Sequence, residues 1–325
     1  MSDVAVIGGA GFIGSRLVEA LDGPRVIDRK IPEDGPGRFR IDVRDRERLI
    51  PALEGVGTLC LLAAEHRDDV EPTSLYYDVN VGGAKNVVEA AVRLGIQRIL
   101  FTSTVAIYGL NAPDAGEDSP PDPFNDYARS KWQAEQTLVA WAKEDPSRSL
   151  VIVRPCVIFG EGNRGNVYNL LSQLAARRFL MVGNGTNRKS MAYVGNLVAL
   201  MTRFLDSPNG IQVFNYADKP DLSMKRLLQV ATDELGVDLP GWTVPHPVGL
   251  AAGFGFDVLA RLTRRKLPIS AVRVRKFCAN TTVNTDRLAS TGFEAPYSLE
   301  EGLRRMIRAE FPVEADPPRQ LQEAM

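Results

Sequence analysis

A glycine-rich segment close to the start of the chain limits the possible folds more than any other feature of the sequence. It separates the apolar run 4–7 from an amphipathic helical pattern and contains Gly8, Gly9, Gly11 and Gly14. Glycines at this spacing permit a tight strand-to-helix turn and let backbone N–H groups approach a pyrophosphate at a helix N-terminus. We therefore predict a dinucleotide site, with contacts at Gly8, Gly11, Phe12, Ile13 and Gly14.

The acidic residue that follows predicts which dinucleotide binds. The next apolar run ends in Asp28, twenty residues after Gly8, where a carboxylate accepts hydrogen bonds from a ribose and repels a 2′-phosphate. NAD is therefore favoured over NADP, although Arg29 is a counter-signal, which we interpret as a solvated charge. Asp42 and Val43 end the following run, and Asp42 is expected either at the adenine or as a helix N-cap.

Short apolar runs alternate with longer helical patterns over the first half of the chain, which is typical of βαβ units and a parallel sheet. Strands are expected at about 3–7, 25–28, 38–42, 57–62, 97–102 and 149–154, and helices at about 12–21, 45–53, 73–94 and 126–143. Beyond these we expect a helix near 166–177, a strand at 213–216 that rejoins the sheet, other short helices, and an amphipathic helix near 298–310. The expected fold class is α/β, a doubly wound parallel Rossmann sheet with a smaller, mixed C-terminal substrate domain.

The domain boundaries are expected where this alternation loosens. The NAD-binding Rossmann domain is predicted to comprise 1–165 and about 189–217, and the substrate-binding domain 166–188 and 218–313. Residues 314–325, with two adjacent prolines, are expected to form a flexible tail.

Composition excludes several classes of function. Lys and Arg total 39 and Asp and Glu total 40, so the net charge of −1 argues against a nucleic-acid binder. Two His and three Cys without a C-x-x-C pair predict no metal site and no disulfide scaffold. An apolar strand begins almost at once, and no apolar stretch reaches the ~18 residues of a spanning helix. We therefore expect a cytoplasmic protein.

A Tyr/Lys pair predicts the reaction chemistry. Tyr127 and Lys131 are four residues apart and share one face of the helix that follows a Pro-rich loop. A phenol with a pKa of about 10 needs a nearby cation to act as a base near neutral pH. Thr104 follows a strand end expected to face the cofactor crevice, and its hydroxyl would orient the reacting group.

These segments together resemble the extended short-chain dehydrogenase/reductase superfamily over about residues 3–311. The resemblance rests on the glycine segment, Asp28, Leu62-Ala63-Ala64, Thr104 with Tyr108-Gly109, Tyr127 with Lys131, and Arg154-Pro155. It implies that Tyr127 is the acid/base, that Lys131 contacts the ribose, and that Thr104 completes the catalytic set. It further implies cofactor contacts at Asp42, Val43, Leu62, Ala63, Ala64, Thr102, Tyr127, Lys131 and Pro155.

Other positions narrow the branch. The 4,6-dehydratases carry an Asp-Glu pair where this chain has Val105-Ala106, which cannot transfer protons. Val157, Lys189 and the run 194–196 differ from the usual pattern of UDP-sugar epimerases. Four longer runs, 61–70, 74–81, 163–171 and 189–196, are similar to bacterial 4-epimerases of lipid-linked N-acetylhexosamines. That resemblance implies interconversion of GlcNAc and GalNAc on a diphospho-undecaprenol carrier during O-antigen or related glycan assembly.

The expected substrate contacts are Glu65, His66, Thr104, Asn163, Arg164, Asn166 and Lys189. Glu65 and His66 follow the fourth strand and are expected at the sugar, with a structural loop hydrogen bond as the alternative for His66. Asn163, Arg164 and Asn166 are expected at diphosphate oxygens, or else as caps of their own loop.

One segment, about 246–266, bears on a lipid-linked substrate. The uncharged run 248–256 precedes Arg261, Arg264, Arg265 and Lys266, a combination that predicts peripheral contact with the cytoplasmic face of the inner membrane. The alternative is a buried helix capped by solvated arginines.

Three alternatives to the lipid-linked epimerase remain open. They are a UDP-sugar (UDP-GlcNAc or UDP-Glc) 4-epimerase, a net NAD-dependent keto-sugar or 3β-hydroxysteroid-type oxidoreductase, and an NAD-sensing regulator without catalysis. The superfamily resemblance also implies a homodimer through helices 73–94 and 126–143, although a core role explains Trp132 and Trp141 on the second helix equally well.

Overall fold

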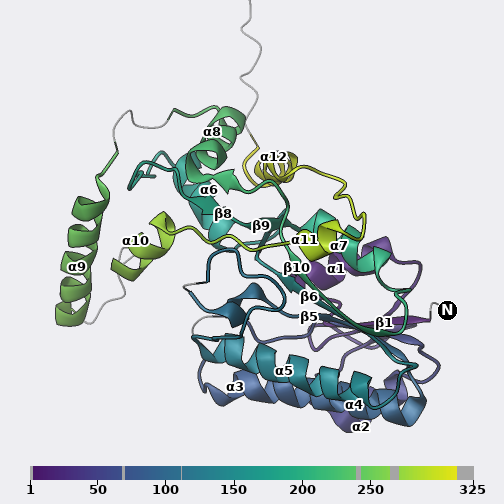
Figure 1. The fold of residues 1–325 in the computed structure, drawn as a ribbon. Helices are drawn as coiled ribbons and strands as arrows, with labels where there is room; N and C mark the ends of the chain where they lie inside the picture. The colour runs from purple at the N-terminus through teal and green to yellow at the C-terminus, as the bar shows by residue number, and fades with distance from the viewer. Residues whose placement is uncertain (1–2, 68–69, 111, 239–242, 264–270, 313–325) are drawn as a thin grey trace, which may run out of the picture. The chain divides into compact units, whose positions relative to one another are not determined.

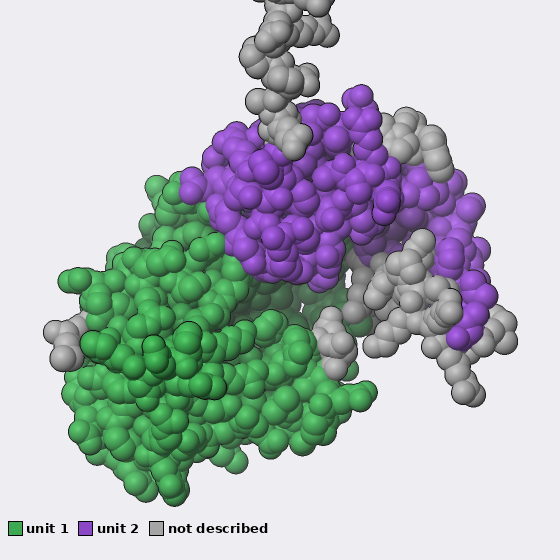
Figure 2. Space-filling view, turned by 180° about the vertical axis from the view of Figure 1, so that it is seen from behind, with its two compact units in different colours: residues 1–158, 188–221, 280–299 green, residues 159–187, 222–279, 300–325 purple. Residues whose placement is uncertain are grey.

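The computed structural model describes residues 3–67, 70–110, 112–238, 243–263 and 271–312. The chain forms two compact units, coloured separately in Figure 2. The first comprises 1–158, 188–221 and 280–299, and the second comprises 159–187, 222–279 and 300–325. The domain boundaries expected from the sequence stay a prediction.

A seven-stranded sheet forms the centre of the first unit. Its strand order is β10-β6-β5-β4-β1-β2-β3, and all neighbouring strands run parallel. The strands are β1 (Val4–Ile7), β2 (Arg25–Ile27), β3 (Arg38–Phe39), β4 (Thr58–Leu61), β5 (Arg98–Thr102), β6 (Ser149–Pro155) and β10 (Gly210–Tyr216). The predicted α/β class is confirmed, and so is the late strand that rejoins the sheet beside β6.

Helices cover both faces of this sheet (Figure 1). One face carries α2 (Arg46–Ala52), α4 (Gly83–Leu94) and α5 (Asp126–Lys143), and the other carries α1 (Phe12–Ala20) and α7 (Val194–Arg203). Leu59, Leu61, Ile99 and Phe101 are buried in a core that also contains Val87 and Leu138 of the covering helices. Because both faces are covered, these strands are continuous apolar runs and do not alternate.

The helix predicted over 73–94 is in three parts. It consists of α3 (Ser74–Tyr77), the π-helical turn η1 (Asp78–Gly82) and α4, which ends at Gly95 with a left-handed φ of 68°. A π turn is a rare single-turn insertion that no residue type specifies, so the sequence pattern predicts one continuous helix here. The turn places Asn80 inside the unit, where it is 3% exposed.

The strand order reverses between β1 and β4. From β1 the chain adds β2 and β3 on one side, and then crosses to β4, β5 and β6 on the other. Ligands of open α/β sheets bind at this reversal, outside the carboxyl ends of the strands. The glycine segment follows β1, and Leu62-Ala63-Ala64 follows β4.

The second unit contains most of the remaining helices. They are α6 (Asn166–Ala175), α8 (Met224–Leu235), α9 (His246–Thr263), α10 (Ala271–Cys278) and α12 (Leu299–Glu310). The sequence predicts short helices here, and this is wrong for α9, which is long. The glycines within it do not end the helix; Gly249 is buried and packs closely on Val182, where a side chain would not fit. The remaining shorter elements of the two units are β7 (Val157–Phe159), β8 (Arg188–Lys189), β9 (Met191–Tyr193), β11 (Leu222–Ser223), η2 (Val105–Tyr108) and α11 (Asp286–Ala289). Across the described residues, no helix has both the length and the apolar character needed to cross a membrane.

Candidate active site

The glycine turn between β1 and α1 leaves no room for side chains. Gly8 has a φ of +92°, and a Cβ there would lie 2.5 Å from the backbone nitrogen of Ala63. A Cβ on Gly14 would lie 2.1 Å from the Gly8 carbonyl oxygen. Gly11 is the extended N-cap of α1, whose first N–H groups have no acceptor within the helix. The turn therefore offers a pyrophosphate close access to the positive end of α1.

Asp28 is held beside this turn. Its Oδ2 accepts the Ala10 N–H at 3.0 Å, and its Oδ1 accepts the Lys30 N–H at 2.8 Å. The neighbouring Arg29 guanidinium lies 3.7 Å from Glu65 Oε2. Arg29 therefore has a carboxylate partner, and its side chain is 50% exposed, so part of the charge faces solvent as the sequence suggested.

The predicted adenine contacts lie after β3. Asp42 pairs with Arg44 through two side-chain hydrogen bonds of 2.9 and 2.8 Å, and the hydrogen bond from Arg44 holds the pKa of Asp42 below its ordinary value. The N-cap of α2 is Asp45, whose side chain accepts the Arg48 N–H, so the N-cap alternative for Asp42 is wrong. Val43 is buried against Gly83.

The segment after β4 places a charged side chain inside the unit. The Leu62 and Ala63 N–H groups both donate to the Ile7 carbonyl at 2.8 and 2.9 Å, which joins this segment to the end of β1. Glu65 is 4% exposed. Burial raises the pKa of its carboxyl, but the hydrogen bond from Arg67 and the charges of Arg67 and Arg29 outweigh burial and hold the pKa low. His66 is exposed, and its contact with a sugar stays a prediction.

Tyr127 and Lys131 lie on the first turns of α5. The helix is capped by Asn125, whose side chain accepts the Ala128 N–H at 2.8 Å. Lys131 is 2% exposed, and its ammonium lies 4.1 Å from the Phe101 ring centroid. Burial lowers the pKa of Lys131 to about 7, although the charge of Glu135 acts in the opposite direction. Lys131 therefore gains or loses its charge near neutral pH.

The end of β5 supplies three hydroxyl groups. Thr104 caps the 3₁₀ turn η2, where its Oγ1 accepts the Ala106 N–H at 3.2 Å. Thr102 Oγ1 and Ser103 Oγ are buried and have no hydrogen-bond partner among the described residues. Buried polar atoms normally find partners, so unpaired ones are typical of a ligand site. With the glycine turn and Asp28, these atoms fit a bound dinucleotide.

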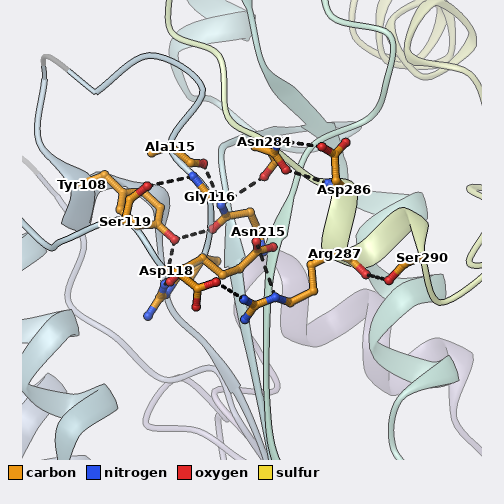
Figure 3. Close-up of polar contacts among 12 residues, drawn as sticks. Tyr108, Ala115, Gly116, Asp118, Ser119, Asn215, Asn284, Asp286, Arg287 and Ser290 are labelled. Atoms are coloured by element: carbon orange, nitrogen blue, oxygen red, sulfur yellow. Dashed lines mark hydrogen bonds and ion pairs between the residues drawn. The ribbon is translucent and has the colours of Figure 1, made fainter.

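Sequence reasoning missed a buried polar network at this end of the sheet (Figure 3). Tyr108 and Arg154 belong to the motifs that resemble the superfamily, but the sequence predicts no function for either residue. Asn215, Glu117 and Glu135 are not predicted at all. Asn215 is fully buried and contacts Tyr108 through its side chain at 2.7 Å. One signal was present, because Glu135 follows Lys131 by four residues and shares its helix face.

The predicted diphosphate residues lie in the loop before α6 and at its first position, in the second unit. Asn163 Oδ1 accepts the Gly165 N–H at 2.8 Å, which is the loop-capping role given as its alternative. Arg164 Nη1 lies 2.8 Å from Glu310 Oε2, and its guanidinium stacks 4.2 Å from the Tyr168 ring centroid. Asn166 is exposed as the first residue of α6, and Lys189 lies on β8 in the first unit. Their contacts with a substrate stay predictions.

Comparisons with known proteins agree with this site. A family model described as the NAD dependent epimerase/dehydratase family matches residues 4–217. The chain is 49% identical over 315 residues to N-acetyl-alpha-D-glucosaminyl-diphospho-ditrans,octacis-undecaprenol 4-epimerase of Escherichia coli O157:H7, with 95% of each protein covered. It is 27% identical over 329 residues to UDP-glucose 4-epimerase of Vibrio cholerae, with 94% of each covered.

A solved structure supports the same assignment. MoeE5 in complex with UDP-glucose and NAD has a TM-score of 0.73 and 25% identity, covering 95% of this chain and 98% of that one. The chain belongs to the NAD-dependent epimerase/dehydratase family. Its cofactor is NAD, and the fold, the glycine turn and these relatives together define an NAD-dependent epimerase.

Proposed function

We propose that the chain is a 4-epimerase that interconverts GlcNAc and GalNAc on a diphospho-undecaprenol carrier. The observation that carries this choice of substrate is the 49% identity to the E. coli enzyme across 95% of both proteins. The Tyr/Lys face of α5 supports the chemistry, because it places the half-buried phenol of Tyr127 one turn from the buried amine of Lys131.

The proposed chemistry uses three side chains. When bound, NAD would supply a reversible hydride acceptor at the sugar C4. Tyr127, as the phenolate, accepts the proton from the sugar O4 and gives it back at the end of the cycle. Lys131 supports the phenolate with its charge, and Thr104 orients the reacting hydroxyl. The 4-keto sugar turns about its diphosphate linkage between the two hydride transfers, and no net oxidation results.

A comparison of carriers tests the substrate. GlcNAc is offered to the purified protein as UDP-GlcNAc and as GlcNAc-diphospho-polyprenol, and the C4 epimer is measured in each reaction. We expect the epimer from the lipid-linked sugar and little from UDP-GlcNAc. Efficient conversion of UDP-GlcNAc alone would instead identify a nucleotide-sugar epimerase. Stoichiometric accumulation of NADH would identify a net oxidoreductase.

A Tyr127→Phe variant tests the residue assignment. It lacks only the hydroxyl, so we expect NAD to bind with unchanged affinity while epimerisation is abolished. Full activity of this variant would remove Tyr127 from the mechanism without affecting the choice of substrate.

We further propose that the protein works at the cytoplasmic face of the inner membrane and contacts lipid through α9. Val248, Phe254 and Leu259 of this helix are 56%, 49% and 46% exposed, which favours membrane contact over the alternative of a buried helix. Arg275 of α10 lies 5.4 Å from the Phe254 ring centroid and adds a positive charge beside the apolar side chains. Arg264, Arg265 and Lys266 lie outside the described residues, and the side chain of Arg261 is not described. Apolar side chains beside a cation favour an anionic membrane surface.

A homodimer through α4 and α5 stays part of the proposal. The two tryptophans of α5 do not support it, because both pack inside the first unit. Trp141 is 1% exposed in the main core, and Trp132 packs on the Ile107–Tyr108 cluster. Val92 of α4 is 54% exposed and is available to such an interface.

A further inference from the structure

Tyr108 joins two strands of the sheet through its hydroxyl group. The hydroxyl accepts a hydrogen bond from Arg154 Nη1 at 2.7 Å and donates one to Asn215 Oδ1 at 2.7 Å. Arg154 and Asn215 are register partners on the neighbouring strands β6 and β10. Burial raises the pKa of Tyr108, so the hydroxyl keeps the proton that it donates.

Arg154 connects this hydroxyl to the helix that carries Tyr127. Its Nε and Nη2 donate to the two carboxylate oxygens of Glu135 at 3.0 and 2.6 Å. Glu135 is 1% exposed and lies one helical turn beyond Lys131 and two turns beyond Tyr127. A bidentate arginine–carboxylate pair fixes both distance and orientation, so the β6 strand and α5 are held in one geometry.

Asn215 connects the same hydroxyl to two loops. Its backbone N–H donates to Glu117 Oε1 at 2.8 Å, and its Nδ2 donates to the carbonyls of Ala115 and Asn284 at 3.0 and 3.1 Å (Figure 3). All of its side-chain hydrogen-bonding groups are used, and the residue is 0% exposed. The network is therefore fully paired at this point and rigid.

The element that carries Tyr108 is also the element that Thr104 begins. Thr104 is the N-cap of η2, and Tyr108 is the last residue of that four-residue turn. A displacement of Tyr108 therefore moves the turn that Thr104 caps. The chain of contacts runs without interruption from η2 through Tyr108, Arg154 and Glu135 to α5.

We propose that Tyr108 is a positioning residue, which sets the distance between Thr104 on η2 and Tyr127 on α5 through its hydroxyl contact with Arg154. This inference rests on the catalytic roles proposed above for Thr104 and Tyr127. The two groups act on the same reacting hydroxyl, so a small displacement of one against the other lowers the rate of the chemical step.

The test compares two Tyr→Phe substitutions in the NAD-loaded enzyme. Tyr108→Phe keeps the ring and removes the hydroxyl that Arg154 and Asn215 contact. Tyr216→Phe is the matched control, because its hydroxyl also donates to a buried acceptor, Asp218, at 2.6 Å. Tyr216 follows Asn215 on β10, and neighbouring residues of a strand point to opposite faces.

We expect Tyr108→Phe to lower kcat by about 10- to 100-fold with KM changed less than about twofold. Tyr216→Phe should keep kcat within about twofold of the parent, although both variants lose a buried hydrogen bond and some thermal stability. Equal effects of the two substitutions on kcat, or an effect of Tyr108→Phe on KM alone, would overturn the proposal.

A second substitution covers the case in which Tyr108→Phe does not fold. Arg154→Lys keeps a positive charge near Glu135, but one ammonium cannot reproduce the fork that spans Glu135 and Tyr108. We expect the same loss of kcat at unchanged KM, and parental kcat in a folded Arg154→Lys protein would contradict the proposal. Failure of the proposed mechanism gives a different result, because full activity of the Tyr127→Phe enzyme would show that Tyr127 is not the acid/base. That result does not depend on Tyr108 or Arg154.

Discussion

The ammonium group of Lys131 lies 4.1 Å from the centroid of the Phe101 ring, inside a unit where Lys131 is 2% exposed. The aromatic face attracts the cation, but the loss of hydration costs more, and burial lowers the pKa of Lys131 to about 7. The residue that is expected to support the Tyr127 phenolate therefore titrates near neutral pH.

This pKa predicts a pH-dependent stability. The unfolded chain binds the Lys131 proton up to a pH of about 10.5, while the folded protein releases it above about 7, so the free energy of unfolding rises with pH between these values. The slope from this group is at most about 1.4 kcal/mol per pH unit. Urea unfolding of the cofactor-free protein at several pH values should show this rise, and Lys131→Met should lack it.

Lys143→Met is the control for that measurement. Lys143 is exposed in the last turn of the same helix, so its loss should leave the pH dependence of the parent unchanged. If the free energies of unfolding of the parent and of Lys131→Met change in parallel from about pH 7 to about pH 9, burial does not lower the pKa of Lys131.

The fold was largely predictable because its signals are local. Each buried parallel strand is a short apolar run. The turn requires glycines because a Cβ, for example on Gly14, would collide with the Gly8 carbonyl oxygen. The π turn η1 and the capping residue of α2 were not predictable in the same way. Asp42 and Asp45 are equivalent as sequence signals, and only the geometry of the backbone decides which one caps the helix.

The site was predictable only where one element carries it. Tyr127 and Lys131 share a helix, so their spacing alone brings them together. Asn215 contacts Tyr108 across 107 residues of sequence, and no pattern in either segment predicts this contact. Arg164 was predicted as a diphosphate ligand, but its ion pair with Glu310, which lies 146 positions later, could not be foreseen.

Gly14→Ala should disrupt the cofactor turn. The added Cβ would lie 2.1 Å from the Gly8 carbonyl oxygen, and backbone atoms on both sides must move. We expect a loss of roughly 1–3 kcal/mol in the free energy of unfolding and NAD binding at least about tenfold weaker. Thermal unfolding and a fluorescence titration with NAD measure the two effects.

Gly255→Ala provides the comparison for this prediction. Gly255 lies inside α9, and a Cβ there would meet nothing within 4 Å, so alanine should stabilise the helix by about 0.5–1 kcal/mol. Unchanged NAD affinity in Gly14→Ala would show that the tight turn does not serve the cofactor.

Asp28→Asn should weaken the preference for NAD over NADP. The amide keeps the shape of the carboxylate but loses the charge that accepts from the ribose and repels a 2′-phosphate. We expect the Kd for NAD to rise about tenfold and the ratio of the two affinities to fall by at least that factor. Asp206→Asn, at a side chain that is 93% exposed, is the control for loss of one negative charge. An unaltered ratio in Asp28→Asn would place cofactor selection elsewhere.

Arg164→Gln tests the proposed diphosphate contact. Glu310 and the Tyr168 ring hold the Arg164 guanidinium in place while its side chain stays 62% exposed, so its remaining donors can meet an anion. Loss of a charge-assisted hydrogen bond should raise KM for the diphosphate-linked sugar about tenfold and leave kcat within about twofold. Arg178→Gln, at an exposed position after α6, should change neither constant. Equal KM values for the two variants would assign Arg164 to loop structure alone.

Exposed apolar side chains on α9 should bind lipid. We expect the parent protein to sediment with vesicles that contain an anionic phospholipid, and the double substitution Phe254→Ser and Leu259→Ser to weaken this partitioning at least about tenfold, because two large side chains no longer enter the interface. The matched control is Leu110→Ser with Ile211→Ser, two side chains that are 56% and 37% exposed in the first unit and lie outside α4 and α5. Both double variants remove similar apolar area from the surface, so only contact through α9 itself makes them differ. Equal partitioning of the two would show that the protein reaches its lipid-linked substrate without this helix.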